Sequence, residues 1–332
     1  VWALPFAVLV GGVLQLATQL VQLKRMRLLP RFASVKSAVR DKAVTKLLRL
    51  MVPAIVGVAV APISILINTN IASRLIEGSV TWLNYADRLM EFPTALLGVA
   101  LGSVLLPSLS RAYARGDTAV YQDLLDTGLK VVFLLAVPAA VGLGFLAEGL
   151  SSVLFQGKNF TALDVAQTSV AVRGYAVGMI GLIGIKIIAP AFYARKDIKT
   201  PMIVAILSVV FIQSLNIVTV PLFAHAGLAI SVALGACFNA LVLLAVLAKR
   251  TWYTPVDGWV RYITRTLVAA GAMALFLSWI QTGTDWVAMQ NAWEIRLVYI
   301  LGIIGSAALV YFALLWLLGW RAQELKHAAR QN

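Results

Sequence analysis

The chain has 332 residues, 61% of them hydrophobic and only 13% charged, with a formal net charge of +14. Soluble domains carry about 25% charged residues, so this composition excludes a single soluble core and favours a fold whose apolar surface faces lipid. The basic residues lie between apolar runs, which indicates membrane topology rather than nucleic-acid binding. The single cysteine, Cys237, excludes an intrachain disulfide, and the sequence has no metal-ligand cluster and no phosphate-cradling loop.

The apolar runs are long enough to cross a bilayer. A spanning helix needs about 20 mostly apolar residues, and lipid cannot satisfy open strand edges. We therefore predict an all-α polytopic membrane protein with nine spans. They are expected near residues 1–23, 50–73, 80–110, 122–148, 165–193, 200–222, 226–248, 260–281 and 295–319. Prolines such as Pro93 and Pro190 lie inside them, and either kinked helices around a cavity or close helix packing would explain these positions.

The connections between spans alternate in charge. Most of the 28 basic residues follow the first, third, fifth, seventh or ninth span, whereas the opposite loops hold only Arg74, Lys158 and Arg296. Basic loops stay in the cytoplasm. We therefore expect the tail, residues 321–332, to be cytoplasmic and Val1 to lie outside.

The segment 24–49 is the clearest boundary in the chain. It is rich in lysine and arginine, and Val35, Val39, Ala43 and Leu47 recur at helical spacing among the charges. This pattern predicts an amphipathic helix on the membrane surface. A solvated basic loop that only sets topology explains it equally well.

The third span carries three ionisable residues within five positions, Asp87, Arg88 and Glu91. Each charge near the middle of a bilayer costs about 2.5–3.5 kcal/mol, so such residues normally face protein or a water-filled cavity. Asp87 and Glu91 are spaced i,i+4, and Arg88 and Glu91 are spaced i,i+3, so both pairs can meet on one helix face. They predict either a self-neutralising ion-pair network or a substrate site, where the planar fork of Arg88 suits a phosphate.

Other polar residues in the spans are weaker candidates for cavity or ion contacts. Asn68 and Asn216 could coordinate a monovalent cation, or could bridge helices. Lys186 and Arg173 could reach the interface or line the cavity. Arg195, which follows the fifth span, is a further candidate.

The run Asn84–Pro93, Asn-Tyr-Ala-Asp-Arg-Leu-Met-Glu-Phe-Pro, resembles the signature region of the MurJ (MviN) lipid II flippases, a family of the MOP transporter superfamily. The stretches 97–110, 181–201 and 225–228 strengthen the resemblance, which covers essentially the whole chain in order. The family has fourteen transmembrane helices with both termini in the cytoplasm, and the nine spans resemble its last nine.

The resemblance implies a domain organisation, with about five further helices expected before Val1. The implied parts are residues 1–23 as the last helix of an N-lobe, 24–49 as a cytoplasmic linker, 50–250 as a C-lobe of six spans, 251–320 as two extra helices associated with a groove for the lipid tail, and 321–332 as a cytoplasmic tail.

The resemblance also implies a transporter rather than an enzyme. Family members move the undecaprenyl-linked peptidoglycan precursor lipid II across the bacterial inner membrane by alternating access, without a cofactor. The family's substrate-binding residues correspond to Asp87, Arg88 and Glu91. Some members have a sodium site with acidic ligands, for which the amides of Asn68 and Asn216 are the nearest counterparts, so a monovalent ion is the one cofactor to consider. The implied partners are lipid II, membrane lipids and cell-wall synthesis proteins, with no nucleic acid.

Three other functions fit the sequence. Another MOP-type exporter or polysaccharide-lipid flippase would share the architecture. A non-catalytic membrane scaffold for the cell-wall machinery would also be polytopic. A membrane transferase could use Asp87 and Glu91 as acid and base, although the short outward loops leave no room for a catalytic domain.

Overall fold

The computed structural model describes residues 3–26, 41–291 and 293–321, and its regular structure in these ranges is helical. The chain divides into two compact units, Val1–Val52 and Pro53–Asn332, which are described separately. Val35 and Val39 of the predicted amphipathic helix and nearly all of the predicted tail lie outside the described residues.

The first unit contains α1 (Ala3–Arg25), an apolar helix of 23 residues that ends on the basic pair Lys24 and Arg25. It also contains the start of α3 (Lys42–Ala72), which continues into the second unit. Because α3 begins at Lys42, the last part of the predicted 24–49 segment is helical and continuous with the second predicted span.

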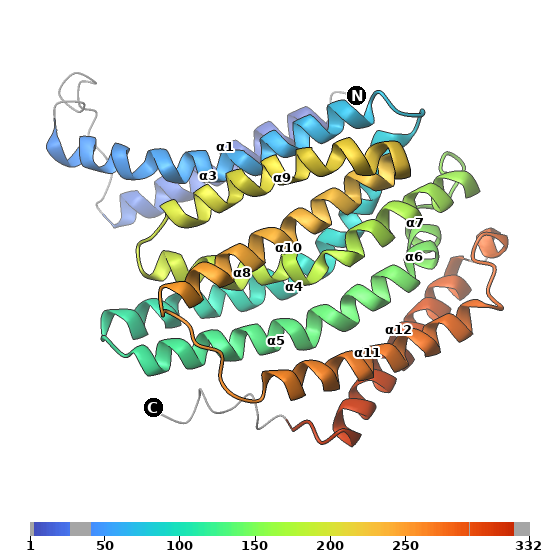
Figure 1. The fold of residues 1–332 in the computed structure, drawn as a ribbon. Helices are drawn as coiled ribbons and strands as arrows, with labels where there is room; N and C mark the ends of the chain where they lie inside the picture. The colour runs from blue at the N-terminus through green and yellow to red at the C-terminus, as the bar shows by residue number, and fades with distance from the viewer. Residues whose placement is uncertain (1–2, 27–40, 292, 322–332) are drawn as a thin grey trace. The chain divides into compact units, whose positions relative to one another are not determined.

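The second unit is a bundle of antiparallel helices (Figure 1). After the rest of α3 come α4 (Ser79–Ala114), α5 (Thr118–Phe145), α6 (Ala147–Phe155), α7 (Ala162–Val177), α8 (Met179–Ala194), α9 (Lys199–Phe223), α10 (His225–Lys249), α11 (Trp259–Gln281), the 3-10 turn η1 (Ala288–Asn291) and α12 (Trp293–Leu317). Among the described residues, six helices are long and apolar enough to cross a membrane, and the α7–α8 pair, bent by 45°, makes a seventh. The predicted all-helical polytopic membrane bundle is thus confirmed.

The fifth predicted span, 165–193, is broken in the structure. The break lies at Gly178, between α7 and α8, whereas Pro190 lies inside the continuous helix α8. Gly178 and Gly181 bring α8 against α10 so closely that a Cβ at Gly181 would lie 2.5 Å from the backbone nitrogen of Cys237. The bend therefore follows from backbone contact with α10 rather than from the proline.

This contact predicts a difference between two neighbouring glycines. Gly181→Ala should destabilise the protein by about 1–3 kcal/mol, because the Cβ would meet the backbone of α10, which cannot move aside without repacking. Gly184→Ala is the matched control, since its Cβ would lie 3.8 Å from the Cβ of Ala240, an ordinary contact. Thermal unfolding of the detergent-purified variants tests this, and equal melting temperatures for the two would contradict it.

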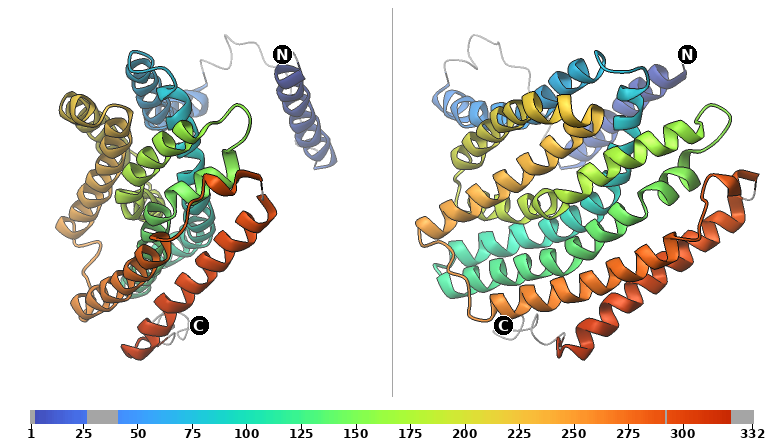
Figure 2. Two further views of the ribbon diagram at one scale, coloured as in Figure 1. Left: turned by 90° about the vertical axis from the view of Figure 1, so that its right-hand side faces the viewer. Right: turned by 45° about the vertical axis from the view of Figure 1, so that its right-hand side comes forward.

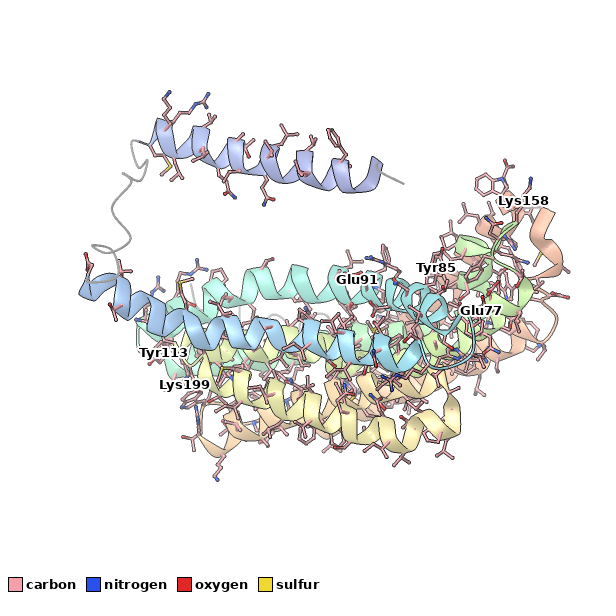
Figure 3. The ribbon with its side chains drawn as sticks, turned by 90° about the horizontal axis from the view of Figure 1, so that it is seen from above. Glu77, Tyr85, Glu91, Tyr113, Lys158 and Lys199 are labelled. Atoms are coloured by element: carbon pink, nitrogen blue, oxygen red, sulfur yellow. The ribbon has the colours of Figure 1, made fainter. Side chains whose placement is uncertain are left out.

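The loops of the second unit form two chemically different ends. Tyr113 and Lys199 lie at one end, and Glu77 and Lys158 lie at the other (Figure 3). Direct contacts join the basic loops at the first end: Arg195 lies over the rings of Tyr113 and Trp252. We call this the basic end, and the other the far end.

Arg296 corrects one part of the sequence interpretation. It was expected in a loop, but it lies in α12 and is only 1% exposed. Its Nη1 donates to Ser152 Oγ at 2.8 Å and to Gln156 Oε1 at 2.6 Å, and also to the carbonyl oxygen of Trp286. The arginine therefore joins α12 to α6 at the far end instead of marking topology.

Two apolar clusters hold the second unit together. The larger is formed by α4, α5, α7, α8 and α10, and the smaller joins α11 and α12 to α5 and α6. Accordingly, α11 and α12 run side by side along one flank of the bundle (Figure 2). The helix α4, which carries Asp87, Arg88 and Glu91, is one of the helices that form the larger cluster.

Candidate functional site

The first turns of α4 are fixed by aromatic contacts at the far end. Trp82 Nε1 donates to Asp164 Oδ1 at 2.7 Å, and the Tyr85 ring packs 4.5 Å from the ring centroid of Phe155. Ala86 and Leu89, spaced as one face of a helix, are buried in the core. Arg88 and Glu91 are thereby held on the opposite face of α4.

Arg88 and Glu91 form an ion pair on that face. Arg88 Nη1 lies 3.2 Å from Glu91 Oε2, and the two side chains are 70% and 59% exposed. This is the only hydrogen bond that Arg88 makes to a described residue. A guanidinium has five N–H donors in a planar fork, so four of them are available to a ligand.

Asp87 lies apart from this pair. It makes no hydrogen bond or ion pair with any described residue, and it lines a cavity of about 460 Å³ together with Asn84, Tyr175 and Asn239. Asn239 is 9% exposed and its Oδ1 has no partner among the described residues. The structure thus separates the three charges into an exposed Arg88–Glu91 pair and a carboxylate at a mostly apolar cavity that also holds amide side chains.

The amides of Asn68 and Asn216 are brought together, with Gln213 as a third member. Asn68 Oδ1 accepts from Asn216 Nδ2 at 3.0 Å and from Gln213 Nε2 at 3.2 Å, while Asn216 Nδ2 also donates to Gln213 Oε1 at 3.0 Å. In the orientation that satisfies these hydrogen bonds, N–H donors face the oxygens of Asn68 and Gln213, whereas Asn216 Oδ1 is buried with no partner among the described residues. The triad bridges α3 and α9, and Asn68 also lines the cavity that the Asp87 carboxylate lines. The ion contact at Asn68 and Asn216 stays a prediction.

Two of the three basic candidates, Lys186 and Arg195, lie in different parts of the second unit. The stem of Lys186 packs on α4, since a Cβ at Gly98 would lie 2.7 Å from Lys186 Cγ. Gly98 shares a helix face with Asp87, but eleven residues, or about 16 Å, separate them. Arg195 lies at the basic end, with its guanidinium carbon 4.4 Å from the centroid of the Tyr121 ring and 4.5 Å from that of Trp252.

Beside this aromatic cage, Asp197 forms an ion pair with Arg250 at 2.5 Å between Oδ2 and Nη1. Burial alone would raise the pKa of Asp197, but hydrogen bonds from Thr200 and Arg250 outweigh burial and hold the pKa below its ordinary value. The loop after α8 is thereby fastened to the end of α10. These contacts give the basic end a structural role.

A buried charge with three side-chain partners was missed by the sequence interpretation. Asp126, 3% exposed in α5, accepts hydrogen bonds at 2.7 Å from Tyr253 Oη and Trp259 Nε1, and pairs with Lys130 Nζ at 2.7 Å. Tyr262 Oη donates to the Lys130 carbonyl oxygen. The network ties α11 to α5. Only the i,i+4 spacing of Asp126 and Lys130 could have signalled it.

Spanning helices with an exposed ion pair on one face of α4, and a cavity lined by a carboxylate and amides among apolar residues, define a polytopic membrane protein of the transporter class. The profile of the family described as lipid II flippase MurJ matches residues 1–297. The chain therefore belongs to the lipid II flippase MurJ family, which confirms the resemblance drawn from the Asn84–Pro93 run.

Curated relatives support the same family. The chain is 45% identical over 99% of its length to the lipid II flippase MurJ of Burkholderia cenocepacia, and 38% identical over 97% of its length to the probable lipid II flippase MurJ of Haemophilus influenzae. It spans 64% of the length of each of these relatives.

Solved structures confirm the fold. A structure of lipid II flippase MurJ in an inward closed conformation matches with a TM-score of 0.65 at 20% identity, over 86% of this chain and 57% of that one. An outward-facing multidrug resistance MATE family transporter of the MOP superfamily matches with a TM-score of 0.53 at 15% identity, over 90% of this chain and 70% of that one. At these identities the likeness establishes the fold alone.

Proposed function

We propose that the full-length protein carrying this chain translocates lipid II from the inner to the outer leaflet of the bacterial inner membrane. The observation that carries the proposal is the exposed guanidinium of Arg88. It lies in a membrane helix and uses one of its five N–H donors in the hydrogen bond to Glu91. A charge in a membrane helix is costly, and the ion pair with Glu91 leaves four guanidinium donors without a partner among the described residues. It suits a pathway that admits an anionic head group such as a pyrophosphate.

The roles of the three charged residues follow from their positions. Arg88 pairs with the pyrophosphate of the lipid. Glu91 holds the guanidinium in place through the 3.2 Å ion pair, and Asp87, at the cavity that it shares with Asn84 and Asn239, binds donors of the sugar-peptide head. Alternating access then carries the head across while the polyprenyl tail stays in lipid.

The proposed topology follows from charge. The basic end faces the cytoplasm, because positively charged loops are retained there, and the C-terminal tail is cytoplasmic. Movement of net charge during the step would couple it to the membrane potential at about 2.3 kcal/mol per charge per 100 mV. The proposed partners are lipid II, membrane lipids and the cell-wall synthesis proteins that use the product.

The test is made in cells depleted of their own flippase. The full-length coding sequence should restore growth and restore the pool of lipid II that an externally added lipid II-cleaving enzyme can reach. Restored growth with no externally accessible lipid II would favour a scaffold. Covalently altered lipid product would favour a transferase. Restored export of an unrelated compound without either effect would favour a different MOP-type exporter.

A further inference from the structure

A second opening lies at the far end of the bundle, away from the charged face of α4. It is a groove of about 750 Å³ between α5, the α7–α8 pair and the last turn of α11. Its walls are almost entirely apolar, including Val137, Val141, Val177 and Ile180, and the one charged residue that lines it is Arg173. Such a groove is shaped for an apolar chain beside one anionic group.

Contacts between helices fix the depth of Arg173. A Cβ at Gly144, next to the last residue of α5, would lie 3.6 Å from the Cβ of Ala176. At the end of α11, Gln281 donates a hydrogen bond to the carbonyl oxygen of Phe145. Ala176 is therefore level with the ends of α5 and α11. Arg173 lies one helical turn, about 4.5 Å, further toward the far end than that level.

The guanidinium of Arg173 has no hydrogen-bond partner among the residues that the structure describes. It makes no hydrogen bond or ion pair with any residue that the structure describes, and Glu148, in the first turn of α6, is not paired with it. The polar groups of α11 are already used: Ser278 Oγ donates to the Leu275 carbonyl oxygen, and Thr282 Oγ1 donates to the Trp279 carbonyl oxygen. A ligand head group would thus be recognised by charge at one guanidinium.

The apolar part of the groove continues inward from that level. Val137 lies eight residues before Phe145 on α5, which is about 12 Å along the helix. Half of a bilayer's hydrocarbon core is about 15 Å thick. The groove is therefore long enough to hold most of one acyl chain.

We propose that this groove binds an anionic membrane phospholipid, with its phosphate at Arg173 and an acyl chain along Val137, Val141 and Ile180. The planar fork of arginine matches a phosphate, and charge complementarity favours an anionic over a zwitterionic head group. The groove shares no lining residue with the Asp87 cavity.

Native mass spectrometry of the purified full-length protein in a neutral detergent tests the proposal. Phosphatidylglycerol and phosphatidylcholine with the same acyl chains are titrated separately, and undecaprenyl phosphate forms a third arm. One basic residue near an anionic lipid contributes on the order of 1 kcal/mol, so Arg173→Gln should weaken phosphatidylglycerol binding about fivefold and leave phosphatidylcholine binding unchanged.

Two further variants sharpen the result. Arg74→Gln is the matched control, since Arg74 is exposed in the 73–78 connection at the far end and does not line the groove; it should bind like the parent protein. Val177→Trp fills the groove from a position that is 61% exposed, so the fold should tolerate it while binding of both phospholipids falls. Unchanged phosphatidylglycerol binding by Arg173→Gln would overturn the proposal, as would preferential binding of undecaprenyl phosphate.

Discussion

Replacing Arg88 with alanine should lower lipid II translocation by the full-length protein by about 10²- to 10³-fold. Hydrogen bonds to charged groups contribute about 1.5–3 kcal/mol each, and a two-pronged contact with a pyrophosphate would use two of the four donors that Arg88 keeps unspent. Loss of both therefore costs about 3–6 kcal/mol, and the lower part of that range, about 3–4 kcal/mol, corresponds to this change in rate. The measurement is the initial rate at which lipid II becomes accessible on the outside of cells or vesicles.

Two variants separate charge from geometry at this position. Arg88→Lys keeps the positive charge but loses the planar fork, so its rate should fall between those of the parent and Arg88→Ala. Arg115→Ala is the control on the same helix, because Arg115 is the exposed C-cap residue of α4 at the basic end. A normal rate for both Arg88 variants would refute the role assigned to this guanidinium.

Asp126→Ala should destabilise the protein by about 3–5 kcal/mol, the usual cost of breaking a buried ion pair by removing one partner. The change leaves Lys130 charged and only 17% exposed, and it removes the acceptor of the Tyr253 and Trp259 donors. Because these donors hold the connection before α11, the loss should loosen α11 and α12 before the rest of the bundle. Thermal unfolding and limited proteolysis in the 250–258 connection measure both effects.

The double variant Asp126→Leu/Lys130→Met is the informative comparison. It removes both charges together, so no unpaired buried cation remains, and its stability should lie well above that of Asp126→Ala. A double variant no more stable than the single one would show that the hydrogen bonds of Tyr253 and Trp259, not the ion pair, hold the network. A melting temperature unchanged in Asp126→Ala would contradict the account of this cluster altogether.

Much of the fold follows from local sequence. Each predicted span coincides with a helix or with the bent α7–α8 pair, because a run of about 20 apolar residues leaves the chain few alternatives in lipid. Of the nine predicted spans, six helices, or seven with the bent pair, are long and apolar enough to cross a membrane among the described residues. The helical spacing of Ala86, Leu89 and Met90 likewise places Arg88 and Glu91 on the face opposite the core. These features depend on residues close together in the chain.

The features that were missed depend on distant residues. Asp126 is 127 residues from Tyr253 and 133 from Trp259, so no local pattern joins them. Arg296 resembled a loop marker because its buried partners, Ser152 and Gln156, come from another helix and the loop that follows it. The site residues remain predictions in the same sense: spacing shows that Asp87 and Glu91 can share a face with Arg88, but not which of them contacts substrate.

Binding of lipid II to the purified full-length protein tests the central claim most directly. Affinities for lipid II and for undecaprenyl phosphate, which lacks the pyrophosphate and sugar, would be measured for the parent protein and for Arg88→Gln. The account predicts that the parent prefers lipid II and that Arg88→Gln loses this preference by at least tenfold, with little change for undecaprenyl phosphate. Equal affinity of the two proteins for lipid II would contradict the claim that Arg88 receives the head group.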